Sequence, residues 1–330
     1  MATLSPHDLA KNGLAKNDLG QPTLHQNTLG TATLVSATKP PRRRATRDGS
    51  AATPMAGFAS RFGVMAVLLI AAVYFLMPIW WLLVASTKPA GRQFVGNGLW
   101  FDGFGLVDNV AAVFAVNNGV FGRWMLNSVF YAGTAALIGT VLSAMAGYAI
   151  AKYSFKGRGL IFGAVLAAVL IPKVMFTLPL FLMFNQVGLL NNPLAVLLPS
   201  VVSPFGVYLA RVFAAQSVPD ELIEAGRLDG AGEFRIFRSV SMRIMAPALV
   251  TIFLFQFVEV WNNYLLPAMV LNDTSLQPVT VGLVGWAASN GNVPAGTVVV
   301  GAFLSIIPLV IAFLCLQRFW RAGLTAGAIK

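Results

Sequence analysis

The residues best suited to bind a small hydrophilic molecule are polar and aromatic side chains that interrupt the apolar stretch 245–271. They are Glu259, Trp261, Asn262, Asn263 and Tyr264. Carboxylate and amide groups can form hydrogen bonds with hydroxyl groups, and aromatic rings can stack on the C–H face of a sugar. In a membrane-crossing helix such polar groups are costly against lipid, so they face protein or a water-filled cavity. The cluster is therefore a candidate substrate surface.

A packing role explains the same cluster, and the two interpretations remain open. The residues would then pack and hydrogen-bond between subunits, or form a Trp–Tyr belt at the membrane interface. On one continuous helix, Glu259, Asn262 and Asn263 fall at i, i+3 and i+4 and share a face. Trp261 and Tyr264 point elsewhere on that helix, so they are weaker candidates for the same contact.

A second group of charged side chains is suited to docking against another protein. It occupies Glu224–Pro247, between two apolar segments. Pro219 and the acidic residues that follow it predict a helix start, since negative charge is favourable at a helix N-terminus. Asp229-Gly230 predicts a tight turn, and a second helical segment is expected over Glu233–Met245.

Both predicted helices carry apolar stripes. The stripe residues are Leu222, Ala225 and Leu228, then Phe234, Phe237, Val240 and Ile244. An interfacial helix lying on lipid is the alternative interpretation. An anionic membrane surface would repel the acidic residues of this loop, which are Asp220, Glu221, Glu224, Asp229 and Glu233. The pattern therefore favours a protein partner.

The residue types needed for several kinds of catalysis are missing from the membrane region. His7 and His25 are the only histidines, and Cys315 is the only cysteine. No His-based catalytic site, metal constellation or disulfide is therefore expected, and no cofactor. The phosphate-binding pattern GxxxxGK[ST] does not occur, so nucleotide binding by that route is excluded.

The composition is that of an integral membrane protein. Hydrophobic residues make up 57% of the 330 residues and charged residues only 11%, with a mean hydropathy of +0.72. About 20 apolar residues cross a bilayer as a helix. Six such spans are predicted: Gly63–Ser86, Trp124–Ala151, Leu160–Phe184, Pro193–Ala215, Met245–Leu271 and Thr297–Phe319. The third contains two prolines and a lysine, so we expect it to be broken.

The net charge of +11 reflects membrane orientation rather than nucleic-acid binding. With six spans, all Lys and Arg residues fall on one side except Lys88, Arg92, Arg123 and Lys173. Positive charge is enriched on the cytoplasmic side, which places both termini and the charged loop in the cytoplasm. The basic run 41–47 is suited to contact anionic membrane lipid.

The first 58 residues differ from the rest of the chain. Leucine recurs every five residues from Leu4 to Leu34, among many Gly, Asn and Thr residues. Seven such repeats would bury little core, so residues 1–58 are expected to form a disordered cytoplasmic tail. A short repeat structure and a true start at Met55 or Met65 are the alternatives. Residues 59–330 would then form the six-helix domain, including the loop 216–244.

The charged loop resembles the cytoplasmic EAA loop of ABC-transporter permeases, closest to the maltose-type carbohydrate-uptake family. The matching residues are Glu224, Ala225, Gly226, Asp229, Gly230, Ala231, Phe234, Phe237 and Pro247. Gly226 replaces an alanine of the pattern, which costs about 1 kcal/mol of helix propensity and predicts a looser helix. Arg243 stands where that family usually has a Leu-Pro pair. Further similarity lies in RWMLNSVFYA, GYAIAKYSFKGR and the C-terminal GLTAGAIK.

The resemblance implies an all-α, six-span permease of the type I ABC importer architecture in a bacterial inner membrane. It implies separate ABC ATPase subunits, a second homologous permease, an extracytoplasmic solute-binding protein and a carbohydrate-like substrate. Glu224 would pair with a basic ATPase residue, and Gly230 would set the bend. The chain itself would not be an enzyme.

Three other functions were weighed against this one. They are an ABC permease for another solute, an ion-coupled secondary transporter and a membrane scaffold. Ion coupling usually needs acidic residues within the spans, and Glu259 is the only one in the six predicted here. A scaffold would need neither the EAA-like loop nor a polar cluster inside a span.

Overall fold

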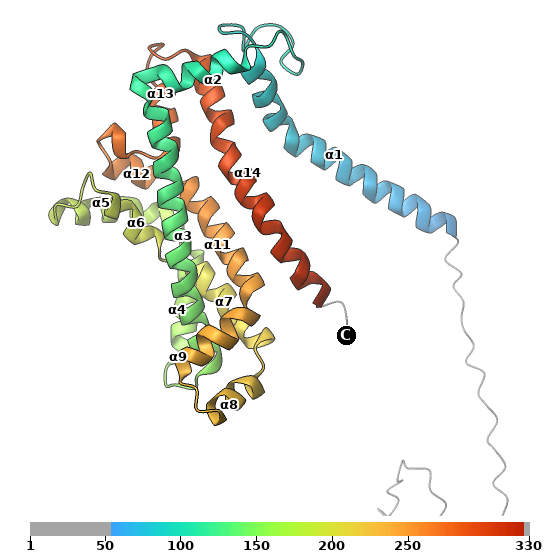
Figure 1. The fold of residues 1–330 in the computed structure, drawn as a ribbon, viewed down its shortest axis with the longest axis vertical. Helices are drawn as coiled ribbons and strands as arrows, with labels where there is room; N and C mark the ends of the chain where they lie inside the picture. Colours follow the sequence, from blue (N-terminus) through green and yellow to red (C-terminus); the bar gives the residue numbers. More distant parts are fainter. Residues whose placement is uncertain (1–53, 327–330) are drawn as a thin grey trace, which may run out of the picture. The chain divides into compact units, whose positions relative to one another are not determined.

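The computed structural model describes residues 54–326, and all regular elements within this range are helices (Figure 1). They are α1 (Pro54–Thr87), α2 (Leu106–Ala115), η2 (Val116–Gly119), α3 (Val120–Lys152), α4 (Arg158–Leu170), η3 (Lys173–Phe176), α5 (Thr177–Gln186), α6 (Pro193–Ser200), α7 (Pro204–Ser217), α8 (Asp220–Leu228), α9 (Glu233–Ile236), η4 (Phe237–Ser241), α10 (Met242–Ile244), α11 (Ala246–Trp261), α12 (Leu265–Val270), η5 (Thr274–Leu276), α13 (Val279–Ala287) and α14 (Ala295–Ala326). The leucine repeat and the basic run 41–47 lie outside the described residues. Because α1 begins at Pro54, the expected boundary at residue 58 falls inside a helix.

Four helical stretches of the described region are long and apolar enough to cross a membrane. They are Arg61–Thr87, Leu106–Lys152, Pro193–Ser217 and Ala295–Gln317. Two bent pairs raise the number to six if each pair is one span: Arg158–Leu170 with Lys173–Gln186, and Glu233–Ile244 with Ala246–Trp261. The structure therefore supports between four and six spans.

The third predicted span is broken, as its prolines indicate. α4 and the η3–α5 segment meet at an angle of 94°. Ile171, just before Pro172, has extended backbone angles of φ −81° and ψ 121°. A residue that precedes proline is driven out of the helical region by contact with the proline ring.

The fifth predicted span, 245–271, is not one continuous helix. α11 ends at Trp261 and α12 begins at Leu265. In a continuous helix the ring of Pro267 would clash with the carbonyl of Asn263, and its missing N–H would leave that carbonyl without a partner. The expected continuous helix is therefore wrong beyond Trp261, although the N–H of Asn262 still makes the helical bond to the carbonyl of Val258. Asn263 lies after the helix, so the face expected for all three polar residues does not extend to it.

The fourth span is also interrupted, and a side chain from another helix repairs the break. α6 ends at Ser200, and α7 begins at Pro204. Pro204 has no N–H to donate to the carbonyl of Ser200. The Nε2 of Gln256 in α11 donates to this carbonyl instead, at 2.8 Å. Ser203 caps α7 by accepting a hydrogen bond from the N–H of Gly206 at 3.1 Å.

Helices α3 and α7 approach closely because small residues line their contact. A Cβ atom added at Gly147 would lie 2.5 Å from the Cβ of Ala210. One added at Gly206 would lie 2.6 Å from the Oγ of Ser143. Small residues at four-residue spacing allow helix backbones to approach in membranes, where packing replaces the hydrophobic driving force.

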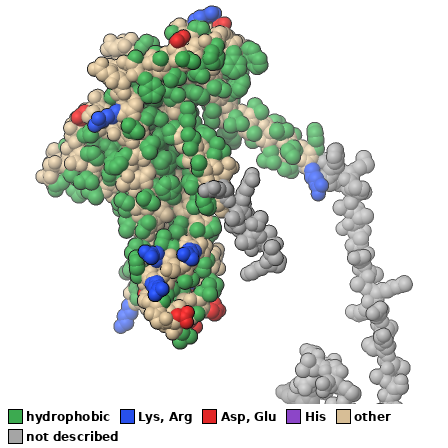
Figure 2. Space-filling model, viewed as in Figure 1, with side chains coloured by type: hydrophobic (Ala, Val, Ile, Leu, Met, Phe, Trp, Pro, Cys, Tyr) green, Lys and Arg blue, Asp and Glu red, His purple; other side chains and the backbone are tan. Residues whose placement is uncertain are grey.

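Buried side chains form one cluster toward each end of α3. Near α13 the cluster includes Phe121, Trp124, Phe257, Trp261 and Trp286. Near α8 and α9 it includes Tyr148, Ile223, Ile236, Phe237 and Met245. Charged side chains are sparse on the face drawn in Figure 2 and gather mainly around the α8–α9 end.

The close contact of α3 and α7 predicts a large difference between two glycines of α3. We expect Gly147→Ala to destabilise the folded protein by about 1–3 kcal/mol, because the added methyl group overpacks the contact. Gly133→Ala is the matched control, since a Cβ at Gly133 meets nothing within 4 Å. The measurement is the thermal unfolding midpoint in detergent; equal midpoints for the two variants would contradict the packing described.

Candidate functional site

The EAA-like loop forms a helix, a tight turn and a second helix. α8 follows Pro219 and ends at the cap residue Asp229. Gly230 has a φ of +76°, in the left-handed region that glycine adopts without strain. The N–H of Ala231 donates to the carbonyl of Gly226 at 3.0 Å, which closes the turn. The predicted helix–turn–helix geometry is confirmed.

Gly226 allows the two helices of the loop to pack tightly. A Cβ at Gly226 would lie 3.1 Å from Cγ1 of Ile236, tighter than an ordinary contact. Ile223 and Ile236 are buried on the same inner side. Glycine at this position therefore leaves room for Ile236, and the looser helix expected from its low helix propensity stays a prediction.

The apolar stripe expected on the second helix is wrong in its register. Phe237–Ser241 form a π-helical turn, which shifts the face presented to the core. Phe237 and Ser241 are buried, whereas Phe234 is 66% exposed. Together with Leu222 and Leu228, which are 45% and 89% exposed, Phe234 leaves apolar surface on the outside of the loop.

The acidic and basic residues of the loop divide into tethered and exposed groups. Asp220 forms an ion pair with Lys152, with Nζ and Oδ1 2.7 Å apart. Glu233 accepts a hydrogen bond from the hydroxyl of Tyr153 at 2.8 Å and pairs with Nε of Arg227 at 2.6 Å. Glu224 is exposed. Two acids thus hold the loop on the end of α3, while Glu224 faces outward.

The reasoning from sequence missed Lys152 and Tyr153 as partners of this loop. Both residues lie in the segment GYAIAKYSFKGR. A lysine at the end of a predicted span, in a chain with an acid-rich loop on the same side of the membrane, could have indicated an ion pair. Burial and the hydrogen bond to Glu233 raise the pKa of Tyr153 above its ordinary value. Its hydroxyl therefore keeps its proton at neutral pH and remains a donor to Glu233.

The polar cluster of the fifth predicted span is divided by the break after α11. Glu259 pairs with Lys173 across 2.5 Å, joining α11 to the bend of the third span. The Nδ2 of Asn262 donates to the carbonyl of Val258 at 2.9 Å. The backbone carbonyl of Asn263 accepts from Thr280 Oγ1 at 3.3 Å.

The two aromatic residues of the cluster occupy different environments. Trp261 is only 2% exposed and stacks on Phe257, with ring centroids 5.7 Å apart. Its ring therefore belongs to the core of this chain. Tyr264 is 38% exposed and remains accessible beside Asn262.

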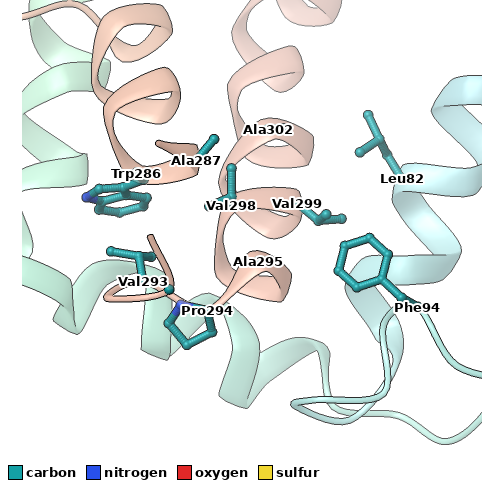
Figure 3. Close-up of a pocket in the computed structure, with 11 residues that line it drawn as sticks. Leu82, Phe94, Trp286, Ala287, Val293, Pro294, Ala295, Val298, Val299 and Ala302 are labelled. Atoms are coloured by element: carbon teal, nitrogen blue, oxygen red, sulfur yellow. The ribbon is translucent and has the colours of Figure 1, made fainter. Parts of the chain in front are cut away.

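An apolar cavity of about 410 Å³ lies elsewhere, beside α13 and α14 (Figure 3). Its lining includes Leu82, Phe94, Trp286, Val298 and Val299. None of the polar cluster lines it, so the cavity offers little for recognising a hydrophilic solute. Among the described residues, no group of three or more His, Cys, Asp and Glu residues could hold a metal ion.

The Lys173–Glu259 pair predicts charge-dependent rescue. We expect Lys173→Met and Glu259→Gln each to destabilise the protein, because each leaves the other charge without its partner at membrane depth. Since both side chains are about half exposed in this chain, the coupling energy should be on the order of 1 kcal/mol. The exchange Lys173→Glu with Glu259→Lys should recover stability in a double-mutant cycle.

The Arg92–Asp102 pair is the matched control, because its side chains are similarly exposed at 56% and 40% but lie outside the predicted spans. Arg92→Gln should change stability little. Additive single effects at Lys173 and Glu259, with no recovery in the exchanged variant, would contradict the ion pair.

The comparison with protein families gives one match that covers more than half of the chain. The family described as "Binding-protein-dependent transport system inner membrane component" matches residues 139–324. Arabinooligosaccharides transport system permease protein AraQ of Halalkalibacterium halodurans is 35% identical over 256 residues, covering 77% of this chain and 90% of the relative. Lactose transport system permease protein LacG of Rhizobium radiobacter is 30% identical over 264 residues, covering 80% and 94%.

A solved structure has the same fold. It is the crystal structure of a bacterial ABC transporter involved in the import of the acidic polysaccharide alginate. The similarity has a TM-score of 0.66 at 24% identity, covering 79% of this chain and 97% of that chain.

Proposed function

Because the chain belongs to the family of inner membrane components of binding-protein-dependent transport systems, we propose that it is a permease subunit for import of a carbohydrate or carbohydrate-like solute. The printed names of two relatives, which concern arabinooligosaccharides and lactose, support this solute class. ATP hydrolysis belongs to a separate subunit. Uptake of arabinooligosaccharides and lactose by proteoliposomes containing the complete transporter tests the class, and no uptake of any carbohydrate would refute it.

The proposed topology has six spans with both termini in the cytoplasm. In this topology α4 with η3–α5 is the third span, and α11 is the main helix of the fifth. Residues 233–244, which meet α11 at an angle of 80°, stay in the cytoplasmic loop. This arrangement places the loop 216–244 on the same side as most of the basic residues. In this topology residues 1–58 would be a cytoplasmic tail, and residues 59–330 would be the permease domain.

The exposed face of the EAA-like loop is the observation that carries the proposal for coupling. The side chains of Leu222, Leu228 and Phe234 are exposed, whereas Ile223 and Ile236 of the same loop are buried. Glu224 adds an unburied carboxylate to this surface. Exposed apolar side chains and an exposed carboxylate on one short loop are suited to a groove on an ABC ATPase subunit, and a basic residue of the ATPase would pair with Glu224.

The state of Glu259 weighs against ion-coupled transport. It is the only acidic residue in the six predicted spans, and Lys173 already compensates its charge. A carboxylate engaged by lysine is a poor site for Na⁺ or H⁺. Coupling through a separate ATPase, a second homologous permease and an extracytoplasmic binding protein therefore accounts better for the chain.

Charge reversal at the exposed carboxylate should uncouple the permease. We expect Glu224→Lys to abolish co-purification of the ATPase and uptake, while the subunit still inserts into the membrane. A charge-assisted pair across a desolvated interface is worth about 2–5 kcal/mol when one partner is removed. Normal uptake by this variant with an intact ATPase complex would count against the proposed contact.

Two glycines of the loop, one with a positive φ and one without, provide a test of the bend and its matched control. Gly230→Val should also impair ATPase binding, because valine is strained at a φ of +76°. Gly232 has an ordinary φ of −68°, and a Cβ there meets nothing within 4 Å. Gly232→Val should therefore bind the ATPase normally.

We assign the substrate pathway to the accessible part of the polar cluster at the α11–α12 break. Asn262, Asn263, Tyr264 and Glu259 remain candidates, and Trp261 is the weakest because its ring is buried. The break supports this role, since irregular backbone at membrane depth is tolerated where it is buried in protein or lines a water-filled cavity.

Cysteine labelling tests the pathway. In a Cys315→Ser background, single cysteines at positions 262 and 264 should react with a water-soluble thiol reagent, and transported sugar should slow the reaction. A cysteine at Phe104, which is 74% exposed and lies outside the six predicted spans, is the labelled control for a site unaffected by sugar. Absence of labelling at both positions, with and without ATP, would favour the packing interpretation.

A further inference from the structure

Helix α3 carries a row of polar side chains that hold the backbone of a distant segment. Trp124 Nε1 donates to the carbonyl of Thr274 at 2.7 Å. Asn127 Nδ2 donates to the carbonyls of Ser275 at 2.8 Å and Gln277 at 3.0 Å. The remaining contacts are Tyr131 hydroxyl to the Leu276 carbonyl at 2.8 Å, and the Val279 N–H to Ser128 Oγ at 2.8 Å.

These donors and acceptors lie on one face of α3, at positions i, i+3, i+4 and i+7. Trp124, Ser128 and Tyr131 are each at most 3% exposed. Successive carbonyls of residues 274–277 are therefore bound by side chains and not by a neighbouring strand or helix. A shift of the segment along α3 would break several hydrogen bonds at once, which fixes its register.

The adjoining residues are held as tightly. Gly282 of α13 lies against the indole of Trp124, and a Cβ at Gly282 would overlap that ring. Asn191, in the connection between α5 and α6, accepts from the N–H groups of Asn272 at 3.1 Å and Asp273 at 2.8 Å. Residues 274–282 are thus fixed to α3, and residues 272 and 273 are held by Asn191.

The opposite end of α3 holds the EAA-like loop. Lys152 Nζ contacts Asp220 at 2.7 Å and the Val218 carbonyl at 2.5 Å. Tyr153, which follows the last residue of α3, donates to Glu233 at 2.8 Å. The same helix is therefore attached to the start of each helix of the loop.

Between these attachments α3 has no break. It runs from Val120 to Lys152 without a proline, whereas the third, fourth and fifth spans are all interrupted. At 1.5 Å per residue, Trp124 and Lys152 are roughly 42 Å apart along the helix. A continuous helix of this length, attached by side chains at both ends, moves both attached segments when either one moves.

We propose that α3 is a strut that moves the EAA-like loop and residues 272–282 as one body, with Asn127 as the positioning residue at the far end. This rests on the proposed function, in which the loop receives motion from an ATPase. The segment 272–282 would transmit that motion to the opposite side of the membrane, where the next residues, 283–294, complete the connection to α14.

Replacement of Asn127 tests the positioning role in the complete transporter. Asn127→Leu removes both donors, so we expect stimulation of ATPase activity by the binding protein to fall about tenfold, as expected for loss of one to two hydrogen bonds. Basal ATPase activity and complex assembly should stay unchanged. Asn127→Gln, which keeps an amide donor, should recover part of the stimulation. Unchanged stimulation in Asn127→Leu, or equal loss of basal and stimulated activity, would overturn the proposal.

A cross-link tests whether α3 and the segment move together. Arg123 Nε lies 3.3 Å from the carbonyl of Ser275, so Arg123→Cys and Ser275→Cys can be joined by a short bifunctional thiol reagent in a Cys315→Ser background. We expect the cross-linked transporter to keep its stimulated ATPase activity. The yield of the cross-link is measured by mass spectrometry. The single-cysteine variants control for the reagent. Arrest by the cross-link would show that the segment must slide along α3.

The two hypotheses fail in different ways. If the cysteine-free parent binds no ATPase and takes up no carbohydrate, the proposed function is wrong. If the parent is active and the cross-linked form is not, the strut is wrong and the proposed function stands.

Discussion

Breaks in membrane-crossing helices release backbone groups that lipid cannot hydrogen-bond, and this constraint governs how the chain is assembled. The break between α6 and α7 leaves the carbonyl of Ser200 without a helical donor, and Gln256 from α11 supplies one. In the segment after α12, the short helix η5 supplies one backbone bond, from the N–H of Gln277 to the carbonyl of Thr274. Side chains of α3 donate to the carbonyls of residues 274–277 as well. Side chains of a neighbouring helix thus hydrogen-bond the free backbone groups of each irregular stretch, and these bonds also hold the stretch against that helix.

Because a side chain can reach only a limited distance from its own helix, the helices that supply these donors must lie close to the breaks. Small residues at the α3–α7 contact bring the two backbones together, and Gly147 and Gly206 leave no room for a methyl group. At Gly139 the space that a side chain would fill is taken by Gln256. Close packing and backbone repair therefore depend on the same small residues of α3.

The sequence predicted well those features that depend on neighbouring residues. Apolar length located the helices, Pro172 indicated the break in the third span, and Asp229-Gly230 indicated the turn in the loop. Each of these follows from local backbone chemistry. The resemblance of the loop then indicated a family that the comparisons confirm.

The features that could not be predicted depend on contacts between distant residues. The spacing of the polar residues predicts a helix that continues through Asn262 and Asn263, whereas the structure ends α11 at Trp261, ahead of Pro267. The π-helical turn at Phe237–Ser241 changes which side chains of the second loop helix are buried. No pattern in the neighbouring sequence predicts this turn. The partners Lys173 and Glu259 are far apart in sequence, so only the fold brings them together.

The Lys173–Glu259 ion pair is relevant to the energy source of transport. Lys173 lies at the bend of one broken span and Glu259 near the end of another, so the pair joins two elements with irregular backbone. Loading a coupling ion onto Glu259 would release Lys173 as an uncompensated charge at membrane depth, which is unfavourable. The loop at the other end of α3 has the opposite character, with Glu224 and apolar side chains exposed while its inner face is anchored. The described part of the chain therefore has a paired carboxylate on α11 and an exposed surface on the loop, which we propose as the docking surface for the ATPase. That distribution supports a permease driven by a partner bound to the loop.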